Sequence, residues 1–317
     1  MRTNSILPIA ALVAAALAAP AHADPLKIYG RLDVSMQSSD EQDVSQTQIV
    51  SNASRFGVRG DFDLEGGSAV FYQLEWEVDV ADNSNASHFK SRNQFVGLRG
   101  DWGSFRIGRF DTPFKTAQLK FDLFNDWEGD IKRVLNGEVR ASNIFQYTSP
   151  SLMDDALRLN VALLPGESPV TGNDGLADAM AASIEYGSGP FALALAFESD
   201  VEGTGVDSTR LVGTYKFGDG FRLGAIYQTT DAGPGLDGSG YGLSLAYTAG
   251  LNTFKVQLMD SDTWTTGVGG TWEDSMSVGM DHRLGDRAKL YGFYTTGTDG
   301  ITSLDDSYLG FGLQLNF

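Results

Sequence analysis

The chain lacks cysteine, and this absence removes several classes of protein at once. With no thiol among its 317 residues, it has no disulfide framework, no thiolate nucleophile and no cysteine-ligated metal. Histidine is nearly as scarce, with three residues. Patterns of the Gly-x-Ser-x-Gly, His-Glu-x-x-His and phosphate-loop kinds do not occur either. The sequence therefore predicts a protein that is not an enzyme and carries no cofactor.

Positive charge is also in short supply. The chain has 23 Lys and Arg against 41 Asp and Glu, which gives a formal net charge of −18. Nucleic-acid binding relies on clustered Lys and Arg that neutralise phosphates, and a membrane-surface helix relies on a basic face. We therefore expect no nucleic-acid partner and no basic surface helix.

Long apolar runs are confined to the N-terminus. Arg2 precedes an apolar stretch at residues 6–19, and Ala21-His22-Ala23 fits an A-x-A cleavage site. We predict that residues 1–23 are a cleaved secretory signal peptide, because the run is short for a transmembrane anchor. Later segments never reach ~18 consecutive apolar residues, so a membrane route would require a closed β-barrel, which pairs every backbone group.

Period-two alternation runs through the rest of the chain. In residues 26–36, apolar side chains share one face while Arg31 and Asp33 share the other. A soluble β-sandwich also alternates, but it rarely continues over about sixteen strands, a number within the range of outer-membrane barrels. The same alternation recurs in residues 55–64, 70–80, 191–197, 211–217, 241–247 and 254–258. These patterns predict an all-β transmembrane antiparallel barrel of about 16 strands, formed by a single domain at residues 24–317.

The connections between these segments differ in length. Tight Gly-containing turns at residues 65–68, 101–104, 217–220 and 283–286 alternate with longer polar connections at residues 40–52, 164–178 and 231–239. Short turns at one end and longer loops at the other are typical of membrane barrels. The terminal residues 308–317 alternate as well and end on Phe317, which predicts a closing strand with Phe317 at the membrane interface.

One connection is far longer than the others. More than thirty residues separate Arg109 from Asn143, and they include Phe114, Phe121 and Trp127. Loops longer than ~12–15 residues are uncommon and usually functional. The aromatic residues indicate that this loop packs against another part of the protein.

Several segments together carry a family resemblance. They are Ile28-Tyr29-Gly30-Arg31, Ser54-Arg55-Phe56-Gly57-Val58-Arg59-Gly60, Phe95-Val96-Gly97-Leu98-Arg99-Gly100, Gly103-Ser104-Phe105-Arg106-Ile107-Gly108-Arg109, Asn143-Ile144-Phe145-Gln146-Tyr147-Thr148-Ser149-Pro150 and the terminal Phe317. At these segments the chain resembles the general diffusion porins, the trimeric sixteen-stranded family of Gram-negative outer membranes. The resemblance implies a homotrimer in outer-membrane lipid, with a water-filled channel for ions and small hydrophilic solutes. It also implies that the long third loop folds into the lumen.

The resemblance assigns a pore constriction residue by residue. It places basic residues at Arg31, Arg55 and Arg92, with Arg133 as the best match after the loop and Arg140 as a competing candidate. It places acidic residues at Asp122 and Asp126. Alternation agrees for Arg31 and Arg55, whereas Arg92 shares parity with Val96 and Leu98, so its inward direction rests on the resemblance alone. The resemblance also implies that Phe317 belongs to the signal read during outer-membrane assembly.

Other interpretations remain open at this point. Asp126, Glu128 and Asp130 are weak candidates for a Ca²⁺ site. The turn Asn125-Asp126-Trp127-Glu128-Gly129 is bulkier and more acidic than the Pro-Glu-Phe-Gly-Gly type of the family, and the acidic excess suggests mild cation preference. The alternatives are a substrate-specific channel for an acid, sugar or peptide, and a surface β-protein that binds a partner through its loops.

Overall fold

The structure, a computed structural model, describes residues 26–82, 89–167 and 174–317. The predicted signal peptide lies outside the described residues. No helix in the described part of the chain is long and apolar enough to cross a membrane.

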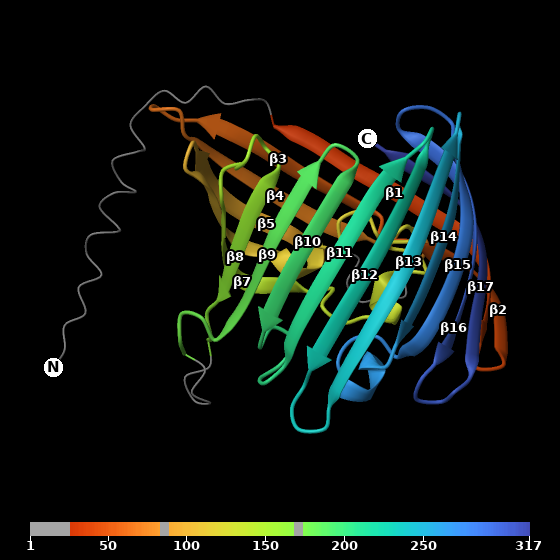
Figure 1. Cartoon of the computed structure of the whole chain (residues 1–317). Coiled ribbons are helices and arrows are strands. Elements are labelled where there is room, and N and C mark those ends of the chain that lie inside the picture. The colour runs from red at the N-terminus through yellow and green to blue at the C-terminus, as the bar shows by residue number, and fades with distance from the viewer. Residues whose placement is uncertain (1–25, 83–88, 168–173) are drawn as a thin grey trace.

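All described strands belong to one antiparallel sheet that closes on itself, because the first strand pairs with the last (Figure 1). The strands are β1 (Lys27–Glu41), β2 (Val44–Ser51), β3 (Arg55–Asp63), β4 (Ala69–Val78), β5 (Phe89–Gly100), β6 (Gly103–Asp111), β7 (Arg140–Thr148), β8 (Leu157–Leu164), β9 (Ala179–Ser188), β10 (Phe191–Ser199), β11 (Asp207–Phe217), β12 (Phe221–Asp231), β13 (Asp237–Ala249), β14 (Asn252–Ser261), β15 (Trp272–Arg283), β16 (Ala288–Asp299) and β17 (Asp305–Asn316).

Two of these strands share one position in the barrel. β2 and β3 both pair with β1, with Val34 opposite Ser51 and Arg31 opposite Arg55. They are one strand interrupted at residues 52–54, so sixteen strands surround the lumen, as the sequence predicted. The expectation that residues 40–52 form a long loop was wrong, because the β-branched residues of β2 extend the sheet and the chain reverses tightly at residues 42–43.

The two faces of the sheet are as alternation predicted. On β1, Ile28 and Met36 point outward with 67% and 60% of their surface exposed, while Asp33 and Ser35 are 1% exposed and point inward. Most strands repeat this arrangement, so apolar side chains cover the outside of the barrel. Such a surface suits a hydrocarbon surrounding and a polar interior.

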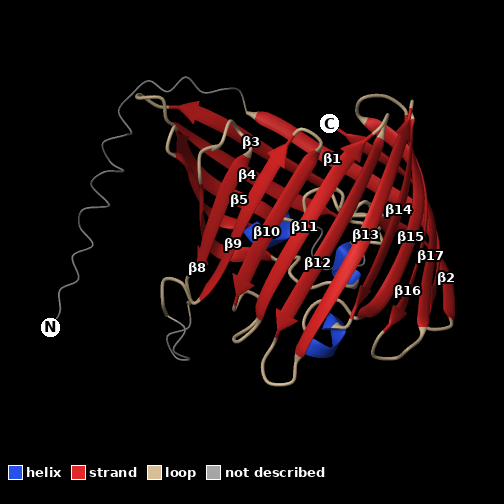
Figure 2. Cartoon of the chain, viewed as in Figure 1, coloured by secondary structure: helices blue, strands red, loops and turns tan. Residues whose placement is uncertain are grey.

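The two ends of the barrel differ, and we call them the turn end and the loop end. The turn end carries short connections such as residues 101–102, 189–190 and 250–251, and the C-terminus lies there (Figure 2). The loop end carries longer connections, including residues 200–206 and 262–271. The second of these contains the 3-10 helix η3 (Thr263–Thr266).

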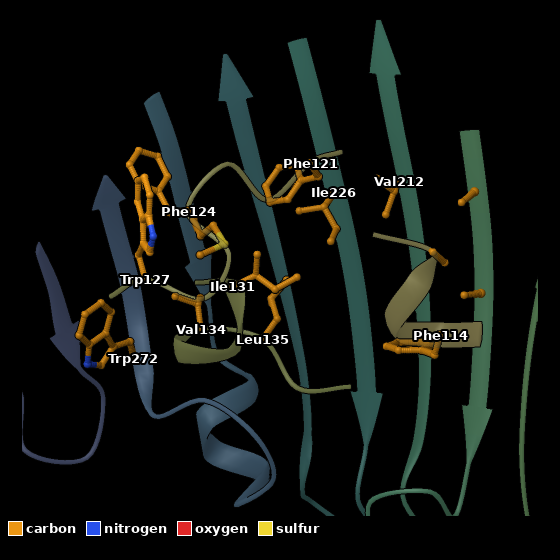
Figure 3. Packing of buried hydrophobic residues seen from close by; sticks show 14 of the residues in the cluster. Phe114, Phe121, Phe124, Trp127, Ile131, Val134, Leu135, Val212, Ile226 and Trp272 are labelled. Carbon is orange, nitrogen blue, oxygen red and sulfur yellow. The ribbon is translucent and has the colours of Figure 1, made fainter. Parts of the chain in front are cut away.

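The longest connection, residues 112–139, joins β6 to β7 and is called the constriction loop below. It contains the short helices α2 (Pro113–Thr116) and η2 (Ile131–Arg133). The loop lies inside the barrel, and its apolar side chains pack on the inner wall, where Phe114, Phe121 and Phe124 are fully buried (Figure 3). The wall contributes residues of β10 to β17 to this cluster, including Val212, Ile226, Trp272, Tyr291 and Tyr308. The larger buried cluster of the protein is therefore the contact between loop and wall, and a smaller one lies on β6 to β8 around Phe110 and Ile144.

Candidate functional site: a constriction inside the barrel

The tip of the constriction loop brings Asp126 against two arginines of the wall. Asp126 has a positive φ of 70°, which turns the chain sharply at this point. Its carboxylate forms ion pairs with Arg55 of β3 and with Arg31 of β1, the latter at 3.2 Å from Oδ2 to Nη1. These three residues, all predicted from the sequence, therefore meet inside the barrel.

The arginines also control the charge of Asp126. Burial by itself raises the pKa of this carboxyl group, but Arg55, Arg92 and Arg31 oppose that effect more strongly. The pKa of Asp126 consequently lies below its ordinary value. The carboxylate is thus held in its ionised form at neutral pH.

Arg92 points into the lumen although alternation alone did not place it there. β4 pairs with β5 through Leu74–Gln94 and then Trp76–Ser91, so β5 has one extra residue opposite Glu75. This bulge changes the parity of β5, and Arg92 becomes buried with 8% of its surface exposed. Its guanidinium binds Glu75 at 2.9 Å and Glu77 at 2.8 Å.

The two competing candidates, Arg133 and Arg140, lie on different parts of the structure. Arg140 begins β7 on the wall and pairs with Asp111 at 3.0 Å. Arg133 belongs to the loop, where it pairs with Glu128 and lies 5.0 Å from the ring centroid of Trp272. Arg140 therefore belongs to the wall with Arg55 and Arg92, whereas Arg133 belongs to the loop.

A polar space of about 560 Å³ separates the loop from this wall. Six basic residues line it: Arg55, Arg92, Lys115, Lys132, Arg133 and Arg140. Six acidic residues line it as well: Glu77, Asp111, Asp126, Glu128, Asp130 and Glu138. Opposite charges thus face one another across this polar passage, with no excess of either sign in its lining.

The structure places Asp122 away from the arginines, between the loop backbone and β14. Its carboxylate accepts hydrogen bonds from the backbone N–H groups of Phe124 (3.0 Å) and Ile131 (3.3 Å), and from Gln257 of β14 (3.4 Å). Asp122 is outside the set of described residues that line the passage. Arg31 is outside that set as well, but it reaches the lining through its ion pair with Asp126. Burial and the neighbouring Asp130 raise the pKa of Asp122 well above its ordinary value. This residue organises the loop against the wall and does not face the arginines.

The three weak candidates for Ca²⁺ ligands, Asp126, Glu128 and Asp130, each bind a different partner. Asp126 binds arginines, Glu128 binds Arg133, and Asp130 accepts hydrogen bonds from the backbone N–H groups of Asp126 (2.9 Å) and Lys132 (3.0 Å). Within the described residues, no group of three or more Asp, Glu or His side chains is arranged to hold a metal ion. The acidic loop is thus organised by its own basic and backbone partners.

The sequence did not predict the contact that holds the loop tip against the wall. Trp127 stacks on Tyr291 of β16 with ring centroids 4.0 Å apart, and the ammonium of Lys255 lies 4.0 Å from the centroid of the Trp127 ring. The available signal was the inward parity of Tyr291 and Phe293, large aromatic residues on a face that is otherwise polar. An inward aromatic pair in a wide barrel indicates that something covers it.

The C-terminal residue closes the barrel. Phe317 exchanges backbone hydrogen bonds with Gly30 of β1, at 2.9 and 3.0 Å. An ideal Cβ on Gly30 would lie 2.4 Å from the Phe317 ring, so the glycine leaves room for that ring. Phe317 is thus part of the seam between the first and last strands.

Comparisons with known proteins agree with this architecture. The family model described as Gram-negative porin matches residues 10–301. Outer membrane porin protein 32 of Delftia acidovorans is 27% identical over 263 residues, which cover 76% of this chain and 73% of the relative. Major outer membrane protein P.IB of Neisseria meningitidis is 28% identical over 151 residues, which cover 44% of each chain.

Solved structures are similar in fold. An anion-selective porin from Comamonas acidovorans superposes with a TM-score of 0.74 at 21% identity, covering 93% of this chain and 100% of that one. Salmonella typhi OmpF superposes with a TM-score of 0.73 at 13% identity, covering 92% and 97%. With the closed barrel, the inward loop and the family match over most of its length, the chain belongs to the Gram-negative porins of the outer membrane.

Proposed function

We propose that this porin passes ions and small hydrophilic solutes by passive diffusion through a charge-balanced constriction, and that it carries out no chemistry. The observation that carries this proposal is the position of Asp126, which the loop presents directly to Arg31 and Arg55. Opposed rows of charge create an electric field across the passage. Dipolar solutes align with this field, whereas apolar solutes displace bound water without replacing its hydrogen bonds.

Selectivity in this proposal comes mainly from the loop end. The lining of the constriction is balanced, but exposed acids crowd the loop end, among them Asp43, Asp207, Asp231, Asp237, Asp274 and Asp305. A negative entrance raises the local concentration of cations. We therefore propose mild cation preference, in contrast to the anion-selective structural relative.

Reversal potentials in a tenfold KCl gradient across a planar bilayer test the constriction. We expect Asp126→Asn to shift the reversal potential toward anions, and the pair Arg31→Gln and Arg55→Gln to shift it toward cations. Two charges ~8 Å apart interact by roughly 0.5 kcal/mol in bulk water and more in a narrow passage, which is enough to change ion partitioning about twofold. Asp219→Asn, an exposed residue of the turn-end connection between β11 and β12, is the matched control. Unchanged selectivity in all constriction variants would reject the assignment.

The dependence of selectivity on ionic strength distinguishes the contribution of the loop-end charges from that of the constriction. Exposed charges are screened beyond a Debye length of ~10 Å at 0.1 M salt and ~3 Å at 1 M salt. The cation preference of the parent should therefore fade as both chambers are raised from 0.1 to 1 M KCl. A preference that persists at 1 M would place its origin inside the passage.

The mature protein and its assembly complete the proposal. Residues 24–317 would form one barrel after removal of residues 1–23, and three copies would associate in outer-membrane lipid. Support for the trimer comes from the family resemblance. An unheated gel and light scattering in mild detergent test the trimer, and a monomer in both would reject it.

A further inference from the structure

A second polar space lies on the turn-end side of the constriction loop. It measures about 530 Å³ and is lined by Arg99, Arg106 and Arg158 of the wall and by Thr116 at the end of α2. Thr116 also lines the constriction, so the two spaces adjoin on the path of a solute. We infer that this second space is a binding subsite for small organic carboxylates, and we call it the turn-end subsite.

Arg106 is the central group of the subsite. Its guanidinium carbon lies 3.9 Å from the ring centroid of Phe110 and 5.1 Å from that of Phe95, so two aromatic rings fix its plane. An arginine has five N–H donors. Within the described residues, Arg106 uses one of them for a side-chain partner, from Nη2 to Gln146 Oε1 at 3.1 Å.

No carboxylate neutralises Arg106 at close range. Among the described residues, none of the ion pairs involves Arg106, and the nearby Asp111 is already bound by Arg140 at 3.0 Å and by Lys115 at 3.4 Å. The held guanidinium therefore keeps donors for a ligand. Arginine matches the planar geometry of a carboxylate, which accepts two parallel hydrogen bonds from it.

The rest of the lining supports an anion. Arg158 likewise has no ion pair among the described residues, while Arg99 pairs with Asp61 at 2.8 Å and remains half-exposed. One acid, Glu185, also lines the space, and its carboxylate accepts hydrogen bonds from Asn160 at 3.1 Å and from Ser183 at 3.3 Å. Three arginines against one glutamate give this subsite a positive excess that the balanced constriction lacks.

Hydrogen bonding holds the subsite in shape. Gln146 accepts from Arg106 and donates to Thr148 at 3.0 Å and to Asn160 at 3.4 Å. Gln146 and Asn160 are almost fully buried, with 5% and 6% of their surface exposed. A network of this kind fixes the direction of the guanidinium before a ligand arrives, which lowers the ordering cost of binding.

This inference rests on the proposed channel function, and succinate block of the KCl current tests it. Sodium succinate is added to the turn-end side of a planar bilayer that holds the channel in a known orientation. We expect a saturable reduction of the current in the parent. Arg106→Gln should raise the half-saturating concentration about tenfold, because a charge-assisted hydrogen bond contributes that much to binding. Arg158→Gln should raise it in the same direction and serves as the second variant if Arg106→Gln assembles poorly.

The controls separate this subsite from the constriction and from the channel itself. Arg59 is a turn-end arginine that stacks on Tyr29 and lies outside the lining of the subsite. Succinate should therefore block the Arg59→Gln channel at the same half-saturating concentration as the parent. Neutral succinamide should not block. Equal half-saturation in the parent, Arg106→Gln and Arg158→Gln would overturn the subsite, as would loss of block in Arg55→Gln alone. A parent that conducts KCl without succinate block overturns only the subsite, whereas a parent that does not conduct overturns the channel function as well.

Discussion

The indole ring of Trp127 lies flat on the phenol ring of Tyr291, with centroids 4.0 Å apart and an angle of 18° between the planes. Both side chains also donate hydrogen bonds to one carboxylate, Asp33 of β1. Lys289 completes the contact, with its ammonium 4.9 Å from the centroid of the Trp127 ring. The residue directly before Trp127 is Asp126, so this stack fixes the carboxylate opposite the wall arginines.

We predict that Trp127→Ala releases the loop tip. Removing a large buried aromatic side chain costs about 3–5 kcal/mol of packing free energy. Single-channel recordings should therefore show larger and noisier currents, and the unfolding temperature in detergent should fall. Trp102→Ala removes a half-exposed indole from a turn-end connection and is the matched control. Quiet currents equal to those of the parent would mean that the tip is held by something else.

Asp122→Asn should leave ion selectivity almost unchanged. The Asp122 carboxylate holds the loop backbone and is outside the lining described for the passage, whereas Asp126 faces it. Reversal potentials of Asp122→Asn and Asp126→Asn, measured side by side, distinguish the two roles. Equal shifts in both variants would show that Asp122 acts on permeating ions after all.

Acid should weaken the contact between Asp126 and the arginines. The folded pKa of Asp126 is lowered, so its ionised form favours the docked tip. That stabilisation is present above the ordinary pKa of about 3.9 and is lost as pH falls through the lower, folded value. Current fluctuations of the parent should therefore increase below about pH 4. In Asp126→Asn the same pH change should have a smaller effect, and an equal effect in both proteins would assign the transition to another group.

Gly242→Val should displace the constriction loop without opening the barrel. An ideal Cβ on Gly242 of β13 would lie 2.7 Å from the ring of Phe121, so this glycine forms the seat of that side chain. We expect altered conductance together with normal heat-modifiable migration on gels. Gly285→Val is the control, because no heavy atom lies within 4 Å of its Cβ position. Conductance equal to that of the parent would mean that the loop adapts to the added side chain.

Loss of Phe317 should block assembly in the outer membrane while leaving export intact. Deleting the residue removes both hydrogen bonds to Gly30, whereas Phe317→Ala keeps the backbone bonds and removes only the ring. Quantifying the heat-modifiable protein in outer-membrane fractions compares the two variants. Normal amounts of the deletion variant would contradict this prediction. A defect in the deletion alone would assign the role to the backbone pairing.

Alternation was sufficient for the barrel and for the inward direction of two arginines. Arg31 and Arg55 lie on the polar faces of their strands, and the structure brings both to Asp126. Arg92 required more information, because a bulge depends on how two strands pair and leaves no mark in the periodicity of one strand. The same holds for the pairing of Arg92 with Glu75.

The directions of the side chains in the constriction loop could not be predicted from the sequence for a related reason. Asp122 and Asp126 are of the same residue type and four positions apart, yet one faces the wall and the other faces the passage. Loop direction depends on tertiary contacts such as those of Trp127 with Tyr291, which have no period along the chain. The turn-end subsite likewise depends on contacts between strands, because Arg106 of β6 stacks on Phe95 of β5 as well as on Phe110.

The constriction loop packs its apolar side chains on the inner wall along β10 to β17, and it meets the opposite wall mainly through polar contacts such as the ion pairs of Asp126 with Arg31 and Arg55. One side of the barrel is therefore two layers thick and the other is a single sheet. Bending stiffness rises steeply with the thickness of a wall. The two-layered side at β10 to β17 should therefore be stiff, and the single-layered side should deform more easily. Fluctuations in pore width should then arise chiefly from β3 to β8, the wall that carries Arg55, Arg92 and Arg140.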